Sequence, residues 1–544
     1  MRNAIKTYAP AVVVCCILFW IVWSTAFPPV AQDELLGESP LQDSTLSAAV
    51  QKVDAWFAAD WEARQLPAAE KADDLTILRR MSLALHGTIP SIEELRQFEA
   101  DTRPDRLAIW CGMMLEDPRF ANYVSERLTR AFVGTQGEPF LVFRRDRFRN
   151  WIAEQLQANR PYDEVVREII SSTGLWTGEP ATNFVTHAVQ DGNVDANKLA
   201  GKTVRAVLGQ RIDCAQCHDH PFAEWKQNQF EGLAAYFGKC RLTAFGIDDP
   251  AGRKYEVEDR QTLEKRVVEP NVPFDAQWLP DTGSQRSQLA VWCTHPENLR
   301  FARATANRVW AIMFGKAYSE AEPYYTRVDD LPDPDPDAQT ALDLLAEQFI
   351  ASGFNLRQLF QTIAASRPFQ MASVSTAEDD ILKKQVEAWA VFPLVRLRPE
   401  QIVGSMLQAS SIKTIDQRSH LLTRTLKLIN ENDFMKEYGD LGADEFESRA
   451  STIPQALLRM NGKLADETIK PNPFNATPRI AMTARNREMV IDTAYLACLS
   501  RYPTDDEHHF FLNQWAEGGK KGTPQKTHDL YWVLFNSPEF SWNH

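Results

Sequence analysis

Apolar side chains recur at three- and four-residue steps along much of the chain, which is the spacing of one helix face. Between residues 107 and 115 this pattern is carried by Leu107, Trp110, Cys111, Met114 and Leu115. The stretch 162–170 repeats the same spacing. Both stretches predict amphipathic helices, and the pattern along the whole chain predicts a mostly α-helical protein.

The second half of the chain continues this helical pattern. Residues 342–350 place apolar side chains on one face and precede Gly353, which suits the position just after a helix end. Asn355 is then placed to cap a further helix over residues 356–363. We therefore expect two consecutive helices here.

The helical spacing stops between residues 240 and 285. Residues 248–252 read Asp-Asp-Pro-Ala-Gly, which is a turn signal, and short alternating pieces follow around 255–257 and 267–268. This pattern predicts a small hairpin or an irregular crossing between two helical domains.

The length of 544 residues suits a chain of several domains. The patterns predict a leader at 1–28, a linker and first helix at 29–70, a first helical domain at 71–240, an irregular or β connector at 241–286, and a second helical domain at 287–544. The predicted fold class is therefore mostly α, with two helical domains joined by a short irregular or β-hairpin segment behind an N-terminal transmembrane helix.

The leader carries the clearest topological signal. Arg2 and Lys6 precede an apolar run over residues 10–27, and no charged residue occurs between Lys6 and Asp33. An uncharged apolar run of about 20 residues can span a bilayer as a helix, and its basic flank favours an N-terminus inside. The segment is either a retained single-pass anchor or a cleaved signal peptide. Both alternatives place the bulk of the chain in the periplasm or outside the cell.

The overall charge narrows the classes of partner. The formal net charge is −14, whereas nucleic-acid binding needs a basic surface, so no nucleic-acid partner is expected. Residues 329–337 read Asp-Asp-Leu-Pro-Asp-Pro-Asp-Pro-Asp. The three prolines favour an extended, solvated loop, and the spacing of the acids matches no known calcium loop.

One short motif carries recognisable chemistry. Residues 214–218 read Cys-Ala-Gln-Cys-His, among 8 cysteines and 10 histidines in the whole chain. The chance of such a C-x-x-C-H run by composition is roughly 2 in 1,000, and the run is typical of c-type haem attachment. Two thiols at this spacing can bond the two vinyl groups of a haem, and His218 then supplies the proximal ligand of the haem iron. Cys214, Cys217 and His218 are therefore the predicted cofactor-binding residues for one haem c.

Other chemistry remains compatible with the same residues. Cys214 and Cys217 could form a disulfide in an oxidising compartment, or could bind a metal together with His218 and His220. The sixth ligand of the iron is open, with these candidates: His86, His187, His295, Met113 and Met114. Cys111 lies on an apolar face and is expected as a buried thiol. With Cys240, Cys293 and Cys498 it could otherwise contribute to as many as two disulfides.

Several enzyme classes lack their motifs in this chain. The sequence contains no phosphate loop, no G-x-G-x-x-G, no G-x-S-x-G and no H-E-x-x-H. No catalytic residues are therefore predicted, and whether the chain is an enzyme stays open. An exported enzyme acting on an envelope polysaccharide would need a cleft with paired carboxylates, which only coordinates can show.

The residues around the motif resemble a known family. The segment 211–222 (Arg-Ile-Asp-Cys-Ala-Gln-Cys-His-Asp-His-Pro-Phe), with Trp225 after it, resembles the planctomycete secreted cytochrome-c-like domain of unknown function. Upstream, Arg79-Arg80-x-Ser-Leu, Asp117-Pro-Arg-Phe120 and Asn159-Arg-Pro-Tyr-Asp163 follow the same signature.

The second half is similar to the domain usually fused behind it. Its marks are Phe301-Ala-Arg303, Asn307-Arg-Val-Trp310, Ser366-Arg-Pro-Phe-Gln370 and Pro454-Gln-Ala-Leu457. The resemblance covers most of residues 75–515 and implies an exported, bacterial-type protein with a cytochrome-like motif but no known reaction. The chain departs from many relatives in lacking a second C-x-x-C-H, and its acidic loop at 329–337 departs from the His-Pro-Glu pattern expected there.

These observations lead to one leading hypothesis. The chain is expected to be a membrane-anchored, exported c-type haem protein that serves electron transfer or redox sensing, with another exported redox protein as a candidate partner. The alternatives are a haem-free exported binding or scaffold protein, in which the motif is a disulfide or metal knuckle, and the envelope-polysaccharide enzyme.

Overall fold

The computed structural model describes residues 39–544, apart from 138–140, 222, 259–262, 319–327, 375–376, 417–451 (except Gly442 and Phe446), 462–474 and 518–521. The predicted leader at 1–28 and the start of the predicted linker lie outside these residues. Within the described part of the chain, no helix is long and apolar enough to cross a membrane.

The first half consists mostly of helices. They are α2 (Ser44–Ala63), α3 (Asp74–His86), α4 (Ile92–Ala100), α5 (Arg106–Glu116), α6 (Pro118–Val133), α7 (Arg145–Gln157), α8 (Tyr162–Ser171), α9 (Asn183–Thr186), α10 (Ala196–Thr203) and α11 (Gln227–Ala235). Side-chain caps start several of them: Asp43 accepts from Thr45 N before α2, and Ser91 with Glu94 forms a capping box on α4. The sequence thus sets many helix starts locally.

The second half is also helical. Its helices are α12 (Gln285–Cys293), α13 (Leu299–Phe314), α14 (Ala341–Ala351), α15 (Leu356–Ala365), α16 (Arg367–Gln370), α17 (Asp379–Glu387), α18 (Pro399–Ala409), α20 (Ile453–Asn461), α22 (Ala476–Thr483), α23 (Arg487–Leu499), α24 (Asp505–Glu517) and α25 (Thr523–Asn536). The predicted mostly α class is confirmed, and so is the Asn355 cap of α15, whose side chain accepts from Gln358 N.

The strands form short antiparallel pairs. They are β1 (Val189–Gln190) with β2 (Asn193–Val194), β3 (Arg241–Thr243) with β4 (Gly246–Asp248), β5 (Tyr255–Glu258) with β6 (Lys265–Val268), and β7 (Val395–Arg396) with β8 (Trp542–Asn543). The β3–β4 and β5–β6 hairpins lie in the predicted connector. In β5–β6 the register pairs Tyr255 with Val268. The alternating residues therefore do form a hairpin.

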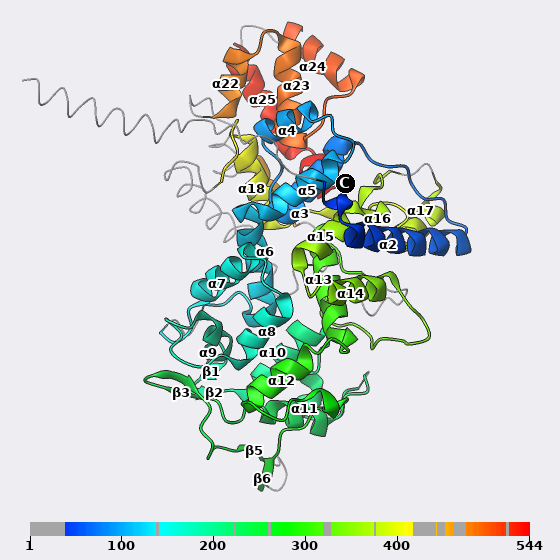
Figure 1. Cartoon of the computed structure of the whole chain (residues 1–544). Helices are drawn as coiled ribbons and strands as arrows, with labels where there is room; N and C mark the ends of the chain where they lie inside the picture. The colour runs from blue at the N-terminus through cyan, green and yellow to red at the C-terminus, as the bar shows by residue number, and fades with distance from the viewer. Residues whose placement is uncertain are drawn as a thin grey trace, which may run out of the picture.

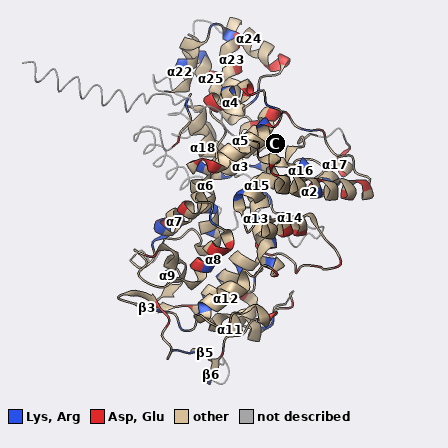
Figure 2. Cartoon of the chain, viewed as in Figure 1, with Lys and Arg blue, Asp and Glu red and all other residues tan. Residues whose placement is uncertain are grey.

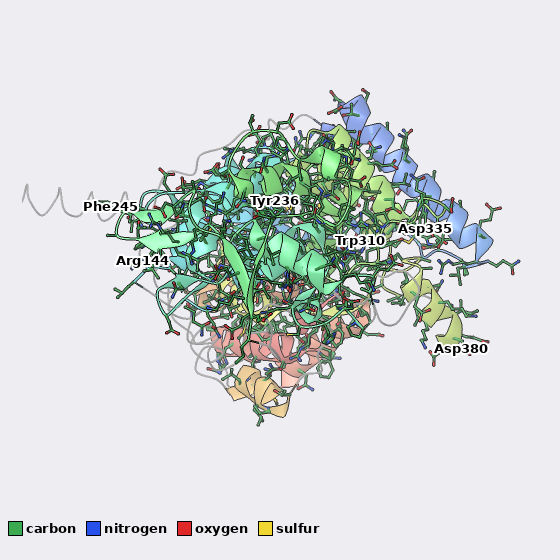
Figure 3. The ribbon with its side chains drawn as sticks, turned by 90° about the horizontal axis from the view of Figure 1, so that it is seen from below. Arg144, Tyr236, Phe245, Trp310, Asp335 and Asp380 are labelled. Carbon is green, nitrogen blue, oxygen red and sulfur yellow. The ribbon has the colours of Figure 1, made fainter. Side chains whose placement is uncertain are left out.

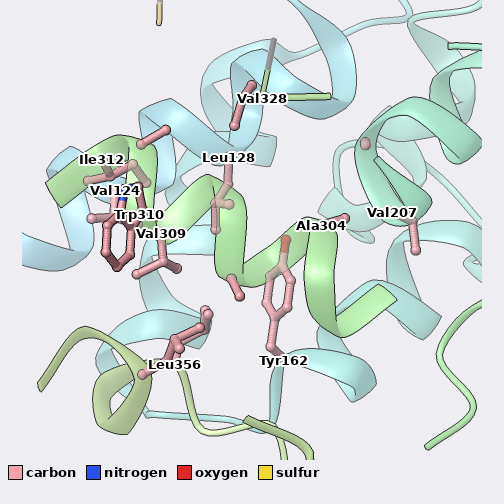
Figure 4. Close-up of a cluster of buried hydrophobic side chains, with 14 of the residues drawn as sticks. Val124, Leu128, Tyr162, Val207, Ala304, Val309, Trp310, Ile312, Val328 and Leu356 are labelled. Carbon is pink, nitrogen blue, oxygen red and sulfur yellow. The ribbon is translucent and has the colours of Figure 1, made fainter. Parts of the chain in front are cut away.

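The larger hydrophobic core is shared by the two halves of the chain. It extends from Val53 to Leu496 along the chain and includes buried residues of α3, α5, α6, α8, α13, α14 and α15. Figure 4 shows part of it, with Leu128 and Tyr162 from the first half beside Val309 and Leu356 from the second. The two predicted helical domains therefore bury their apolar faces against each other.

A second core lies at one end of the molecule. It joins α18, α22, α23 and α25 with Leu83 of α3 and Ile92 of α4. In Figure 1 helices α22 to α25 gather at the top with α4, while α7 to α12 and strands β1 to β6 lie at the opposite end. Charged residues of both signs are interspersed along the helices, as Figure 2 shows.

Buried arginines link the halves as well. Arg80 of α3 donates to the carbonyl oxygens of Phe369 (2.9 Å) and Met371 (2.6 Å), and Arg79 donates to the carbonyl of Cys498 (3.2 Å). Both arginines are at most 1 % exposed. The Arg79-Arg80 signature of the first half is thus held by the backbone of the second half.

Candidate functional site

The segment leading to the Cys214–His218 motif departs from regular α-helix. Helix α10 passes into a π-helical turn, η3 (Val204–Leu208), which ends at Gly209 with φ of 67°. A Cβ at Gly209 would come within 2.8 Å of the Cβ of Ala304 on α13. Only glycine meets both requirements, because it tolerates this left-handed conformation and has no side chain to clash. Single π-turns of this kind are frequent at functional sites.

The motif itself lies on an exposed turn. Residues Asp213–Gln216 form a 3-10 turn, η4, in which Ala215 is buried, as is Ile212 just before it. Cys214, Cys217 and His218 are all exposed. The turn is therefore fixed from beneath by apolar side chains, and it presents all three predicted cofactor-binding residues to solvent.

The imidazole of His218 has a defined tautomer. Its Nδ1 lies 2.6 Å from the carbonyl oxygen of Asp219, and because a carbonyl can only accept, Nδ1 must carry the proton. In the neutral ring Nε2 is then left with its lone pair. A hydrogen bond from the second ring nitrogen to a carbonyl is the usual way in which a metal-ligating histidine is oriented.

The residues after the motif close the loop. His220 N donates to the carbonyl of Trp225 (2.8 Å), and Gln227 N donates to Oδ1 of Asp219 (3.0 Å) at the start of α11. The Nδ1 atom of His220 accepts from Ala223 N (2.9 Å). Because its Nδ1 is engaged in this way, His220 serves the loop's own structure.

A carboxylate from the second half holds the residues just before the motif. Asp329 is 5 % exposed and forms ion pairs with Arg205 of η3 and with Arg211, whose Nη2 lies 2.9 Å from Oδ1. Burial alone would raise the pKa of Asp329, but the two guanidinium groups outweigh burial and hold this pKa below its usual value. The sequence predicted a solvated loop here, which is wrong for Asp329, because the arginines that pair with it lie more than 100 residues away.

The geometry of the motif bears on a disulfide and on a metal site at these residues. The structure holds Cys214 and Cys217 as thiols, with no disulfide among the described cysteines. The described residues also contain no group of three or more His, Cys, Asp or Glu side chains arranged to hold a metal ion.

The described cysteines outside the motif are buried. Cys111, Cys240, Cys293 and Cys498 are present as buried thiols, as predicted for Cys111, and the disulfides considered for these four residues do not form. Burial raises the pKa of the Cys111 thiol to about 12. That thiol therefore stays protonated and unreactive.

The histidine candidates for the sixth iron ligand are engaged elsewhere. His86 contacts the carbonyl of Met114 (3.0 Å), and His187 contacts that of Phe184. Burial lowers the pKa of His86 to about 4 and that of His187 to about 3, so both imidazoles are neutral. The ring of His295 stacks on Trp278. These contacts indicate structural roles for the three histidines.

The aromatic residues after the motif belong to the core. Trp225, Phe230, Tyr236 and Phe237 are each at most 8 % exposed. Figure 3 places Tyr236 within the body of the molecule. A separate cavity of about 210 Å³ lies between α2, α5 and α15, and its lining includes Leu46, Cys111 and Ala364 but no residue of the motif.

The donor set suits a covalently attached haem, whereas the surroundings provide little enclosure. Two thiols and an oriented imidazole lie within five residues on one exposed turn. Ile212 and Ala215 are buried on the inner side of the turn, whereas the two cysteines are exposed. A haem held by Cys214, Cys217 and His218 would therefore lie at the surface.

Comparison with family models finds two matches along the chain. Residues 52–241 match the family model PSCyt2, described as a protein of unknown function (DUF1549). Residues 285–515 match PSD1, described as a protein of unknown function (DUF1553). No curated protein and no solved structure matches the chain. The chain therefore carries these two domains of unknown function in tandem, with the Cys214–His218 motif in the first.

Proposed function

We propose that the chain is an exported, membrane-anchored protein that carries one haem c on Cys214, Cys217 and His218 and serves electron transfer or redox sensing. The observation that carries this proposal is the hydrogen bond from Nδ1 of His218 to the carbonyl of Asp219. It leaves Nε2 as the metal-binding nitrogen of an exposed imidazole, next to two exposed thiols.

Attachment needs only the thiols and the haem. Each thiol adds across one vinyl group, so that a carbon–sulfur bond forms and the thiol hydrogen passes to the other vinyl carbon, with no oxidant required. Because Cys214 and Cys217 are exposed, both can be reached by the haem. Once bound, the haem supplies a one-electron iron couple, and exposure of the site would allow close approach of a redox partner.

Two further observations support the proposal. The label PSCyt2 of the matching family hints at a cytochrome-like domain. The basic residues and the apolar run at the start of the chain favour export. Export matters because c-type haem is attached outside the cytoplasm.

The proposal is tested by haem staining of the denatured full chain after export together with a haem-attachment system. We expect the wild-type chain to stain and to give a haem absorption band, and Cys214→Ala/Cys217→Ala to give neither. Cys293→Ala, which removes a buried thiol outside the motif, serves as the matched control and should stain like the wild type.

Replacement of the proximal ligand gives a second readout. His218→Ala should leave the thiols able to bond the haem but alter its absorption spectrum, because the iron loses its protein ligand. An unstained wild-type chain, or staining that persists without both motif cysteines, would contradict the proposal.

A further inference from the structure

We propose that the second domain positions the haem motif of the first, with Asp329 as the positioning residue. The inference rests on the proposed function, in that it assigns part of the second domain a role at that site. The acidic loop, residues 329–337, lies in the second half of the chain and contacts the residues just before Cys214.

Three consecutive residues before the motif are held by this loop. Leu331 N donates to the carbonyl of Gly209 (2.8 Å). Gln210 Nε2 donates to Oδ1 of Asp333 (2.7 Å), and Arg211 pairs with Asp329 through Nε (3.1 Å) and Nη2 (2.9 Å). Such a continuous set of bonds fixes both the path and the rotation of the backbone entering the turn.

The loop is itself anchored to the second domain. Arg303 of α13 donates to the carbonyl of Pro332 (2.8 Å), and Arg300 pairs with Asp333 (2.9 Å). Asn307 Nδ2 donates to the carbonyl of Val328 (3.1 Å). Helix α13 therefore forms a rigid base, and the loop transmits its position to the motif.

Asp329 is the central contact because it is buried and binds two arginines. Arg205 lies in the π-helical turn and Arg211 lies after Gly209, so a single carboxylate joins both sides of the bend that leads to Cys214. Removing it would leave two guanidinium groups in a largely buried place without this counter-charge. The turn would then lose its fixed orientation while Cys214, Cys217 and His218 stay intact.

Asp329→Asn tests this role, with Asp335→Asn as the matched control. Asp335 belongs to the same loop but is exposed, and its side chain accepts a local bond from Asp337 N; Figure 3 labels it. The first measurement is amide hydrogen exchange of the haem-free full chain. In Asp329→Asn we expect exchange of residues 211–220 to quicken by about tenfold through local opening, and in Asp335→Asn to match the wild type.

The second measurement is made on the haem-loaded chain. Asp329→Asn should load less haem, and the reduction potential of the loaded fraction should be more positive, because loss of the negative charge of Asp329 beside Arg205 and Arg211 disfavours the ferric form. Asp329→Glu keeps the charge and should restore most of the potential. Phe535→Leu, which weakens the second core, controls for general loss of stability and should change neither quantity.

The outcomes separate this inference from the proposed function. If Asp329→Asn leaves both exchange at 211–220 and haem loading at wild-type values, the positioning role is wrong. A wild-type chain that takes up no haem would overturn the proposed function, and the exchange measurement would then decide by itself whether Asp329 holds the turn.

Discussion

At the residue scale, buried arginines with shared carboxylates recur throughout the molecule. Arg127 of α6 and Arg398, just before α18, both bind Glu400 Oε1, at 2.5 Å and 2.9 Å. The two arginines are 3 % and 5 % exposed. Burial raises the pKa of Glu400, but the nearby arginines outweigh burial and lower it to about 2. The charge on Glu400 therefore stabilises the fold by holding together segments that lie far apart in the sequence.

Glu400→Gln should lower the free energy of unfolding by roughly 3 kcal/mol at neutral pH, because it removes the carboxylate charge that the buried Arg127 and Arg398 share. The folded pKa of Glu400 lies below its unfolded value of 4.5, so this stability is present above about pH 4.5 and is lost as pH falls towards about 2. Denaturant titrations of wild type and variant at several pH values measure this difference. A difference that stays constant from pH 7 to pH 3 would contradict the assignment.

At the element scale, the change from α10 to the π-turn η3 decides where the motif lies. The turn ends at Gly209, where the positive φ and the close approach of Ala304 act together. The β1–β2 turn contains a second glycine of similar φ, Gly192 (76°), where a Cβ would meet no atom of the described residues within 4 Å. The two positions therefore separate backbone strain from steric overlap.

Gly209→Ala should destabilise the fold by at least about 2 kcal/mol more than Gly192→Ala. Both variants incur the left-handed strain of about 1 kcal/mol or more, while only the first forces its Cβ against Ala304. Thermal and denaturant unfolding of the two variants measure the difference. Equal losses of stability in the two variants would show that α13 shifts to make room for the added methyl group.

At the scale of the whole molecule, the two matched domains do not pack as separate bodies. The larger core contains residues of both, and Arg80 of the first donates to the backbone of the second at Phe369 and Met371. The second core also includes Leu83 from the first half. Unfolding either half alone would therefore expose apolar surface that the other half covers.

We expect the chain to unfold in a single transition, with far-ultraviolet circular dichroism and tryptophan fluorescence giving the same midpoint. Phe360→Leu in the larger core and Phe535→Leu in the second core should each shift that whole transition to lower denaturant. Two separated transitions, with only one of them moved by each variant, would show that the cores unfold independently.

The local features of this molecule follow from the amino-acid sequence alone. Apolar spacing predicted the helices at 107–115, 162–170 and 342–363, which appear as α5, α8, α14 and α15, and the alternation near 255–268 predicted a hairpin. These features depend on neighbours a few positions apart, so periodicity and caps encode them directly. The thiol spacing of the motif is likewise a local property of five consecutive residues.

The way in which these parts meet depends instead on long-range packing. Asp329 belongs to a loop whose composition predicted a solvated segment, but the fold buries it and pairs it with Arg205 and Arg211. The same fold leaves Cys214 and Cys217 exposed. The partners of Asp329 lie 124 and 118 positions away, and nothing in the local pattern of either segment identifies the other. Burial and ion pairing depend on contacts between segments that meet only when the chain folds back on itself. Helices and turns depend on residues a few positions apart, so the local sequence determines them.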